Sequence, residues 1–523
     1  MFLQLFQRIF QRIFQRIVSD IIMAHSKIHP AKKNYRISHN TCIYALLLLL
    51  CCTVRESFGQ AQYVEDALRY TLPNNLHSVR QGALGLAYNG IADDAAAAFT
   101  NPAGLTLLPA AEFSAGLQGL FNNNTSTYLG NTFVRNSNTI APSHLSLVLP
   151  VRVGESGNYS FSFSYARESD FTRFDSLSGF NTESTLISSW VDGQRTNNLT
   201  NNFAWRLKLA DTVNRRFVTP LRNNLQQNMG LRESGEIHTI AAGFGIDVTP
   251  QIALGVSLIG TFGQFRSFRR IQEIDLQNRY NRLDRINFST VDFFRMSYAE
   301  LLTQSVSGLK FVIGAQGRIG ERTRIGASCT LPLQTRVNEN FSRNAIARFD
   351  PITDSIAFNP PDSPTITYLF STPFVFNLAA STHIDGLTIS GSAEYMNFQG
   401  LNFQGLTLPG AQIDANAVNV AIRNLLNVQV RFGIGAEYEF AGTPFLARGS
   451  FNYASTPYIE GTAEVSPLLT GAVGIGYYLG INGRLDALYR VNQQYSVNQI
   501  YEGATFRSTQ NLHLVAVQYS VRF

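Results

Sequence analysis

Alternation of apolar and polar residues is the main pattern of the chain beyond about residue 110, and it predicts β-strands with one apolar face. In residues 159–166, Tyr159, Phe161 and Phe163 occupy one face and serines the other. Residues 426–440 carry the same alternation over a longer stretch. A strand of that length exceeds the usual strand of a soluble sheet, yet it can cross a bilayer when it is tilted.

The connections between these strands are of two kinds that alternate along the chain. Six short, turn-rich links occur at residues 153–158, 247–251, 320–324, 383–386, 440–444 and 481–484. Seven longer polar stretches occur at about residues 122–142, 167–235, 268–305, 338–366, 399–424, 457–465 and 497–508. This alternation predicts fourteen strands, with short turns on one side of a membrane and long extracellular loops on the other.

No apolar run after residue 60 has the length of a spanning helix. If the chain crosses a membrane with strands, they must close into a barrel, because lipid cannot satisfy a free sheet edge. The predicted fold class is therefore all-β, a transmembrane 14-stranded antiparallel β-barrel formed by residues 111–523.

The end of the chain has a distinctive pattern. Tyr519, Val521 and Phe523 continue an apolar face to the final aromatic residue. This ending resembles the terminal signal that bacterial outer-membrane barrels present to the barrel-assembly machinery. It indicates the outer membrane of a Gram-negative bacterium.

Charge is concentrated at the start of the chain. Residues 1–59 hold eight basic and two acidic residues, whereas the remainder has 34 of each. The basic pI therefore indicates no nucleic-acid partner. A cationic segment followed by the apolar run 42–54 predicts a signal peptide, with the mature protein starting near Gln60. Translation from Met23 is the alternative to a longer leader that begins with a cationic amphipathic helix.

The stretch IADDAAAAFTNPAGL, residues 91–105, differs from the strands around it. Four consecutive alanines favour a helix, Asp93 is a candidate N-cap, and Asn101 before Pro102 predicts its end. A fourteen-strand barrel has a lumen too wide for wall side chains to fill, so it is open or plugged. We interpret residues 60–110 as an N-terminal plug; an alanine-rich linker is the alternative.

Residues 82–117 resemble the FadL/TodX/OmpP1 family of outer-membrane transporters for hydrophobic compounds. The shared motifs are Gly-x-Ala-Tyr at 85–88, Ala-Asp-Asp-Ala at 92–95 and Asn-Pro-Ala at 101–103. Residues 370–398 also look like the family's segment of proline, strand, tight turn and aromatic-ended strand. The resemblance implies a lumenal hatch whose motif is Asp93, Asp94, Asn101, Pro102, Ala103 and Gly104.

The resemblance also implies a function: passive uptake of hydrophobic or amphipathic molecules, such as long-chain fatty acids or hydrocarbons, with sideways exit through a gap in the wall. Some relatives instead serve a type IX protein secretion system, which is the alternative. A general porin is a third hypothesis and requires a polar, open lumen.

The long loops supply candidate residues for ligand capture, because aromatic rings beside arginines suit an amphiphile with an anionic head. The candidates are Trp190, Trp205, Arg269, Arg270, Phe293 and Phe294. Alternatively, the rings pack the loops into a lid, and the arginines face lipopolysaccharide or solvent.

The sequence offers no basis for catalysis. The five histidines after the leader are scattered, no nucleophile elbow is present, and Cys329 is the one cysteine left outside the leader. We therefore predict a protein that is not an enzyme and has no metal or other cofactor. Its expected partners are outer-membrane lipid, lipopolysaccharide and a hydrophobic small molecule, and we expect a monomer.

Overall fold

The computed structural model describes residues 58–72, 76–153, 157–192, 201–281, 292–332, 334–350, 354–361, 365–407 and 415–523. The predicted leader, apart from its last two residues, and the choice between Met1 and Met23 lie outside this range. Within the described residues, no helix combines the length and the apolar character needed to cross a membrane.

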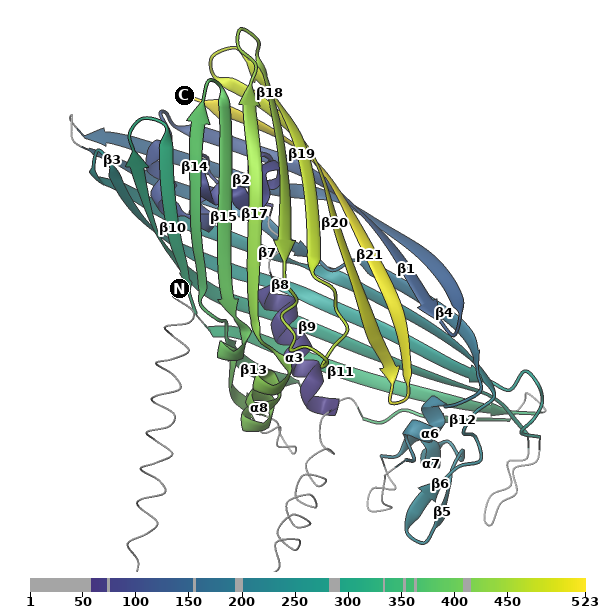
Figure 1. Cartoon of the computed structure of the whole chain (residues 1–523). Helices are drawn as coiled ribbons and strands as arrows, with labels where there is room; N and C mark the ends of the chain where they lie inside the picture. Colours follow the sequence, from purple (N-terminus) through teal and green to yellow (C-terminus); the bar gives the residue numbers. More distant parts are fainter. Residues whose placement is uncertain are drawn as a thin grey trace, which may run out of the picture. The chain divides into compact units, whose positions relative to one another are not determined.

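Short helical segments precede the first strand and occur in the loops (Figure 1). They are α3 (Phe58–Thr71), α4 (Val79–Leu84), η1 (Gly85–Gly90), α5 (Ala97–Thr100), η2 (Pro102–Leu107), α6 (Leu186–Ser189), α7 (Phe203–Arg206), η4 (Phe398–Gly400) and α8 (Ala415–Leu425). The strands of the first half are β1 (Glu112–Tyr128), β2 (Asn131–Val153), β3 (Gly157–Asp170), β4 (Arg173–Asn181), β5 (Asp211–Val213), β6 (Arg216–Val218), β7 (Leu225–Thr249), β8 (Ile252–Ile274) and β9 (Phe293–Ile319). Those of the second half are β10 (Thr323–Leu331), β11 (Gln334–Phe349), β12 (Asp354–Phe358), β13 (Ile366–Ser371), β14 (Val375–Ile384), β15 (Leu387–Asn397), β16 (Asn402–Thr407), β17 (Val428–Glu439), β18 (Phe445–Ala454), β19 (Leu468–Leu479), β20 (Gly483–Tyr501) and β21 (Ala504–Arg522).

The main sheet is antiparallel and closes on itself, because β1 pairs with β21 from Glu112 opposite Arg522 to Thr127 opposite Arg507. The sheet has nineteen labelled strands. Four wall strands are interrupted once and carry two labels each, namely β3/β4, β10/β11, β13/β14 and β15/β16. Since β12 pairs only with β11, the wall has fourteen strands. The predicted fold class is confirmed.

The apolar face of the strands points outward. Phe161 and Phe163 of β3 are 44% and 59% exposed, whereas the alternate residues Ser160 and Ser162 are buried. The last strand repeats this order, with Val517 and Tyr519 outside. A closed barrel with an apolar exterior satisfies its backbone internally and presents hydrocarbon to lipid, as a membrane-spanning barrel must.

Two of the predicted loops are wrong. Residues 122–142 and 497–508 are continuous hairpins, in which β1 runs to Tyr128, β2 starts at Asn131, β20 runs to Tyr501 and β21 starts at Ala504. Beyond the apolar band both faces of a strand contact water or polar groups, so the alternation ends before the strand does. The six predicted short turns all join wall strands as expected.

Three neighbouring wall strands are interrupted at the same level. Pro332 separates β10 from β11, and Pro373 precedes β14. Proline has no N–H for the ladder, so it ends regular pairing. The registers place these breaks side by side, because Val375 pairs with Thr330 below them and Ser371 with Gln334 above.

Above these breaks, β16 pairs with β13, and helix α8 lies beside it. The side chain of Asn419 in α8 accepts a hydrogen bond from the Phe403 N–H at 2.8 Å and donates to the Phe403 carbonyl at 3.1 Å. One amide side chain thus satisfies the groups that a neighbouring strand would have paired. The apolar face of α8, with Val418 and Ile422, packs in one cluster with residues of α3.

We expect Val517→Arg to destabilise the folded barrel in lipid bilayers by about 2–4 kcal/mol, because an arginine would face hydrocarbon near the bilayer midplane. Reversible unfolding in urea with lipid vesicles measures this change. Val218→Arg, on the exposed β5–β6 hairpin, is the matched control and should change stability by less than about 0.5 kcal/mol. Equal losses in the two variants would contradict a lipid-facing Val517.

Candidate functional site

The segment before β1 lies inside the barrel. Helix α4 contacts β19 and β20, η1 contacts β14, β15 and β17, and η2 contacts β7, β8 and β9. These strands belong to opposite sides of the wall, so the segment bridges the lumen (Figure 1). We call residues 76–110 the hatch.

The alanine-rich stretch forms a short helix with a defined end, as predicted. The helix α5 covers four residues, and Asn101 then starts η2 by accepting a hydrogen bond from the Ala103 N–H at 3.3 Å. The assignment of Asp93 as N-cap is wrong. Helix α5 has Ala96 as its N-cap and no side-chain capping bond. Asp94 accepts a hydrogen bond from the Ala96 N–H at 2.8 Å in the turn before the helix, while Asp93 faces the wall.

Asp94 organises the centre of the hatch. Its carboxylate accepts hydrogen bonds from the Tyr88 hydroxyl at 2.6 Å and from the Ser78 hydroxyl at 2.9 Å. All three side chains are buried. Burial and the neighbouring Asp94 carboxylate raise the pKa of Tyr88 well above its usual value, so Tyr88 remains a hydrogen-bond donor.

The Asn-Pro-Ala-Gly motif docks against glycines of the wall. A Cβ on Gly255 of β8 would lie 2.3 Å from Pro102 and Ala103 backbone atoms, and one on Gly314 of β9 would lie 2.1 Å from Asn101 Oδ1. Asn101 also donates to the Ala315 carbonyl of β9 at 3.2 Å. The wall therefore carries no side chain where the motif approaches it.

Glycines also receive the hatch on the opposite side of the wall. A Cβ on Gly433 of β17 would lie 2.7 Å from the Leu86 Cβ, and one on Gly474 of β19 would lie 2.7 Å from the Ala83 Cβ. Within the hatch, a Cβ on Gly104 would lie 1.9 Å from the Ala92 carbonyl oxygen. At each of these contacts a glycine, in the wall or in the hatch, leaves room for the close approach of the neighbouring chain.

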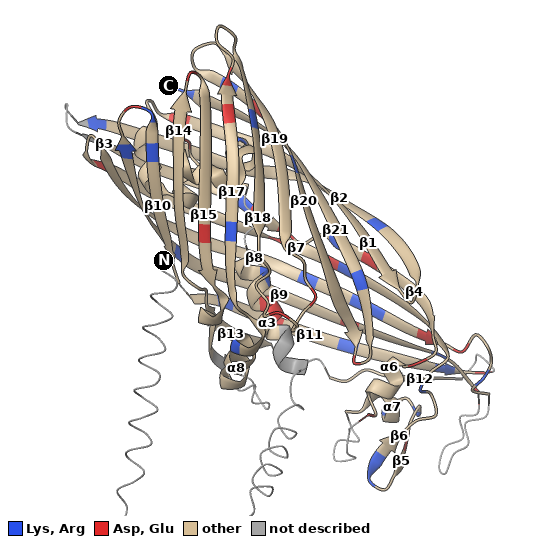
Figure 2. Cartoon of the chain, viewed as in Figure 1, with Lys and Arg blue, Asp and Glu red and all other residues tan. Residues whose placement is uncertain are grey.

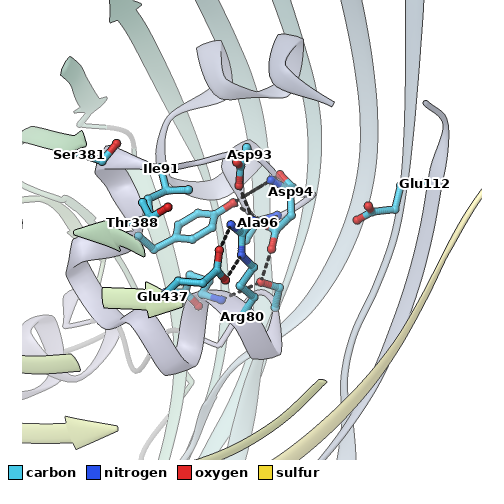
Figure 3. A network of polar contacts seen from close by, with 12 residues as sticks. Arg80, Ile91, Asp93, Asp94, Ala96, Glu112, Ser381, Thr388 and Glu437 are labelled. Atoms are coloured by element: carbon cyan, nitrogen blue, oxygen red, sulfur yellow. Dashed lines mark hydrogen bonds and ion pairs between the residues drawn. The ribbon is translucent and has the colours of Figure 1, made fainter. Parts of the chain in front are cut away.

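A buried ionic network joins the hatch to the wall (Figure 3). Arg80 of α4 donates two hydrogen bonds to Glu437 of β17, at 2.8 and 2.7 Å, and also pairs with Asp93. Asp93 accepts a further contact from Arg324 of β10 at 3.2 Å. Glu437 pairs in turn with Arg448 of β18.

The network keeps its charges ionised. Burial opposes the charged form of Asp93, but the guanidiniums of Arg80 and Arg324 outweigh it and lower the pKa of this carboxyl. Burial also opposes the charge on Arg80, and Asp93 and Glu437 raise its pKa well above its usual value. Removing one partner of such a buried pair leaves an uncompensated charge, at a cost of about 3–5 kcal/mol.

The hatch forms the floor of a lumenal cavity of about 180 Å³. Phe99 of the hatch and Ile259 and Val312 of the wall give it apolar surface. Lys310 of β9 and Arg490 of β20 add two cationic side chains. Most of the remaining lining consists of Thr, Ser, Asn, Gln and charged side chains, so the cavity combines an apolar patch with polar and cationic surface.

The other charges of the cavity have partners. Arg431 pairs with Glu394 at 2.7 Å, and Glu168 contacts His77 at 3.4 Å. Lys310 makes no hydrogen bond or ion pair within the described part of the chain. Its ammonium group interacts electrostatically with Glu168.

The six predicted ligand-capture residues do not form one site. Trp190 packs on Phe203 and Tyr298, Trp205 on Phe217, and Phe293 is buried in the same apolar cluster. Arg269 points inward and pairs with Glu300 at 2.6 Å, whereas the next residue, Arg270, is exposed on the outer face. Phe294 lies near the Arg295 guanidinium. The role of all six in ligand capture stays a prediction.

These aromatic residues hold a folded lid on the β4–β7 connection. Its helix α6 starts at Leu186 and Ile187, whose N–H groups donate to the buried Glu273 carboxylate of β8 at 2.6 and 3.2 Å. The alternative of a packed lid describes their geometry better than a common pocket does. In the described ranges, no group of three or more His, Cys, Asp and Glu residues is arranged to bind a metal ion.

Sequence reasoning missed the wall residues that receive the hatch. Gly255, Gly314 and Gly433 lie in strands whose alternation is otherwise regular, and glycine at inward positions was a usable signal. Arg80 and Glu437 are 357 positions apart, so no local pattern could pair them.

We expect Gly255→Ala to displace the hatch, because the new methyl group would overlap Pro102 and Ala103 backbone atoms. In planar bilayers the variant should show at least tenfold more frequent ion-conducting openings than the unsubstituted protein. Gly260→Ala, on the same strand with no atom nearer than 3.9 Å, is the control and should stay closed. A closed Gly255→Ala barrel would contradict the close contact.

The pKa of Asp93 gives a pH dependence. A depressed pKa means that its stabilising contribution is complete above the ordinary Asp value of about 3.9 and is lost as pH falls through the lower folded value. Openings in bilayers should therefore stay rare down to about pH 4 and increase below it.

Asp93→Asn should raise the opening frequency at pH 7 and reduce its further rise in acid. Asp192→Asn breaks an exposed pair with Arg222, in which both side chains are about half exposed, and should change neither. The same acid response in Asp93→Asn and the unsubstituted protein would refute the role of Asp93.

Comparison with known proteins supports the fold at the level of architecture. No family model and no curated protein matches the sequence. Among solved structures, a FadL homologue of Pseudomonas aeruginosa matches with 13% identity and a TM-score of 0.52, over 86% of this chain and 99% of that one. The toluene transporter TodX of P. putida matches with 12% identity and a TM-score of 0.48, over 82% and 94%. The CymD monoaromatic hydrocarbon channel matches with 12% identity and a TM-score of 0.46, over 85% and 99%. The resemblance predicted from the hatch motif is thus confirmed at the level of fold, and this chain has the barrel architecture of a FadL homologue.

Proposed function

We propose that this chain is a passive outer-membrane transporter for hydrophobic or amphipathic small molecules. The observation that carries the proposal is the cavity between hatch and wall, in which an apolar patch of Phe99, Ile259 and Val312 faces the same space as Lys310 and Arg490. A general porin needs a polar, open lumen, whereas the hatch here bridges the lumen and is held by buried charges.

The cavity supports a compact ligand or ligand segment. Its volume of about 180 Å³ is close to the roughly 150 Å³ of an apolar protein cavity that binds benzene. Lys310 suits an anionic head, because an ammonium group forms charge-assisted hydrogen bonds with a carboxylate. The sequence motifs resemble a family that carries hydrophobic compounds, which favours the same substrate class.

For the exit path we propose the interruption between β3 and β4. The pairing of β2 with β3 ends at His144 opposite Ala166, and beyond it β4 pairs with β7. Side chains bridge the interval, with Ser137 Oγ donating to the Thr172 carbonyl at 3.1 Å and Asn131 Nδ2 to the Ser178 carbonyl at 3.0 Å. Side-chain bridges separate more easily than a backbone ladder does, so this interval is suited to open sideways.

Uptake of radiolabelled substrates by a deletion strain tests the proposal. Restoring the chain should restore uptake of a monoaromatic carboxylate and of a neutral hydrocarbon of similar size. Lys310→Met should lower carboxylate uptake about tenfold, the equivalent of one charge-assisted hydrogen bond, and leave hydrocarbon uptake unchanged.

Lys208→Met removes the other lysine present after the leader, which is exposed in a loop, and should leave both rates unchanged. Unchanged uptake on deletion, together with co-purifying secretion components, would replace this proposal with the type IX secretion role.

A further inference from the structure

A second binding feature lies on the outside of the barrel, away from the hatch and the cavity. On the outer face of β7 and β8, Arg232 lies opposite Phe268, and Arg266 and Arg270 are its diagonal neighbours on β8. All three arginines are exposed. Diagonal neighbours on one sheet face are only about 7–8 Å apart, so these like charges repel one another.

Acidic side chains do not neutralise this cluster. Within the described residues, none of the three arginines forms a salt bridge, whereas the inward-facing Arg269 next to them pairs with Glu300. The nearest outward carboxylate on β7, Glu236, pairs with Arg167 at 2.6 Å and His238 at 3.2 Å. The cluster therefore retains positive charge that an external anion would balance.

A groove of about 440 Å³ runs beside the cluster, between β4, β7 and β8. Its lining includes Arg232, Arg270, Phe174 and Phe268, with the Arg232 guanidinium 5.2 Å from the centre of the Phe174 ring. Gly230, opposite Arg270, forms part of the floor, and a Cβ added there would meet no atom within 4 Å. The groove thus offers apolar rings and donors side by side.

The level of the groove indicates which anion would reach it. Towards the start of β7, the outward position next to the lipid-facing Ile240 is His238, which packs with Phe262. This pair marks the boundary of the lipid-facing band. Arg232 lies six residues further along β7, which is roughly 14 Å beyond this boundary for a strand tilted by about 45°. Basic and acidic residues are distributed along the wall strands (Figure 2), and the register of β7 and β8 places these three arginines next to one another.

We propose that the groove lined by Arg232 and Arg270, together with the neighbouring Arg266, binds the phosphate groups of an outer-leaflet lipid with a phosphorylated sugar headgroup. Guanidiniums form bidentate, charge-assisted hydrogen bonds with phosphate oxygens, and Phe174 and Phe268 pack against the C–H faces of the headgroup sugars. The site lies outside the hatch and the cavity, on the outer face of the wall, so it anchors and orients the barrel in the outer leaflet.

The test adds diphosphorylated lipid A, its dephosphorylated form or inorganic phosphate to the purified full chain in neutral detergent. Thermal unfolding is followed at each concentration. We expect diphosphorylated lipid A alone to raise the midpoint substantially, because binding to the folded state stabilises it. An equal shift with the dephosphorylated lipid, or with inorganic phosphate at the same concentration, would overturn the proposal.

Two variants test separately whether binding depends on the positive charge of the arginines and on the shape of the groove. Arg232→Gln/Arg266→Gln should weaken binding at least tenfold, and Gly230→Leu should weaken it similarly by filling the groove while keeping every arginine. The control Arg295→Gln/Arg348→Gln removes two outward, cross-strand arginines of β9 and β11 and should change affinity less than twofold. An equal loss of affinity in the control variant would show that the lipid binds through general electrostatic attraction, and it would refute a specific groove.

Uptake of the small-molecule substrates is measured in the same variants. We expect normal uptake in all of them, because none touches the hatch or the cavity. The lipid site and the transport function can therefore fail independently.

Discussion

The pairing of β1 with β21 is the contact on which the rest of the structure depends. Lipid offers no partner for backbone N–H and C=O groups, so an open fourteen-strand sheet would leave two unsatisfied edges. Closure removes both edges and creates a lumen that wall side chains cannot fill. The hatch fills this space, and the wall glycines that it contacts and its buried ion pairs hold it there.

Much of the wall follows from sequence pattern. Alternation at Phe161 and Phe163 identifies strands, and the turn-rich links divide them into the correct number. The pattern could not give the true strand ends, because polar residues such as those of residues 122–128 continue the ladder above the apolar band. Backbone pairing extends wherever a neighbouring strand continues, whatever the polarity of the side chains.

The hatch was predictable in kind and not in detail. Four alanines and Asn101–Pro102 indicate a thin helix with a fixed end, and both are present. The exchange of roles between Asp93 and Asp94 depends on Arg80 and Arg324, which come from outside the motif. Adjacent carboxylates are equivalent in sequence, and only the tertiary neighbours distinguish the one that accepts hydrogen bonds within the hatch from the one that binds the wall.

The contact of Asn419 with Phe403 has a consequence for the behaviour of many copies in one membrane. A strand edge with free N–H and C=O groups is a template on which a strand from another chain can add, and crowding makes such encounters frequent. Because the Asn419 amide occupies both groups of Phe403, β16 offers no ready start for intermolecular sheet growth at this point. A single helix residue thus protects the interrupted side of the wall against self-association.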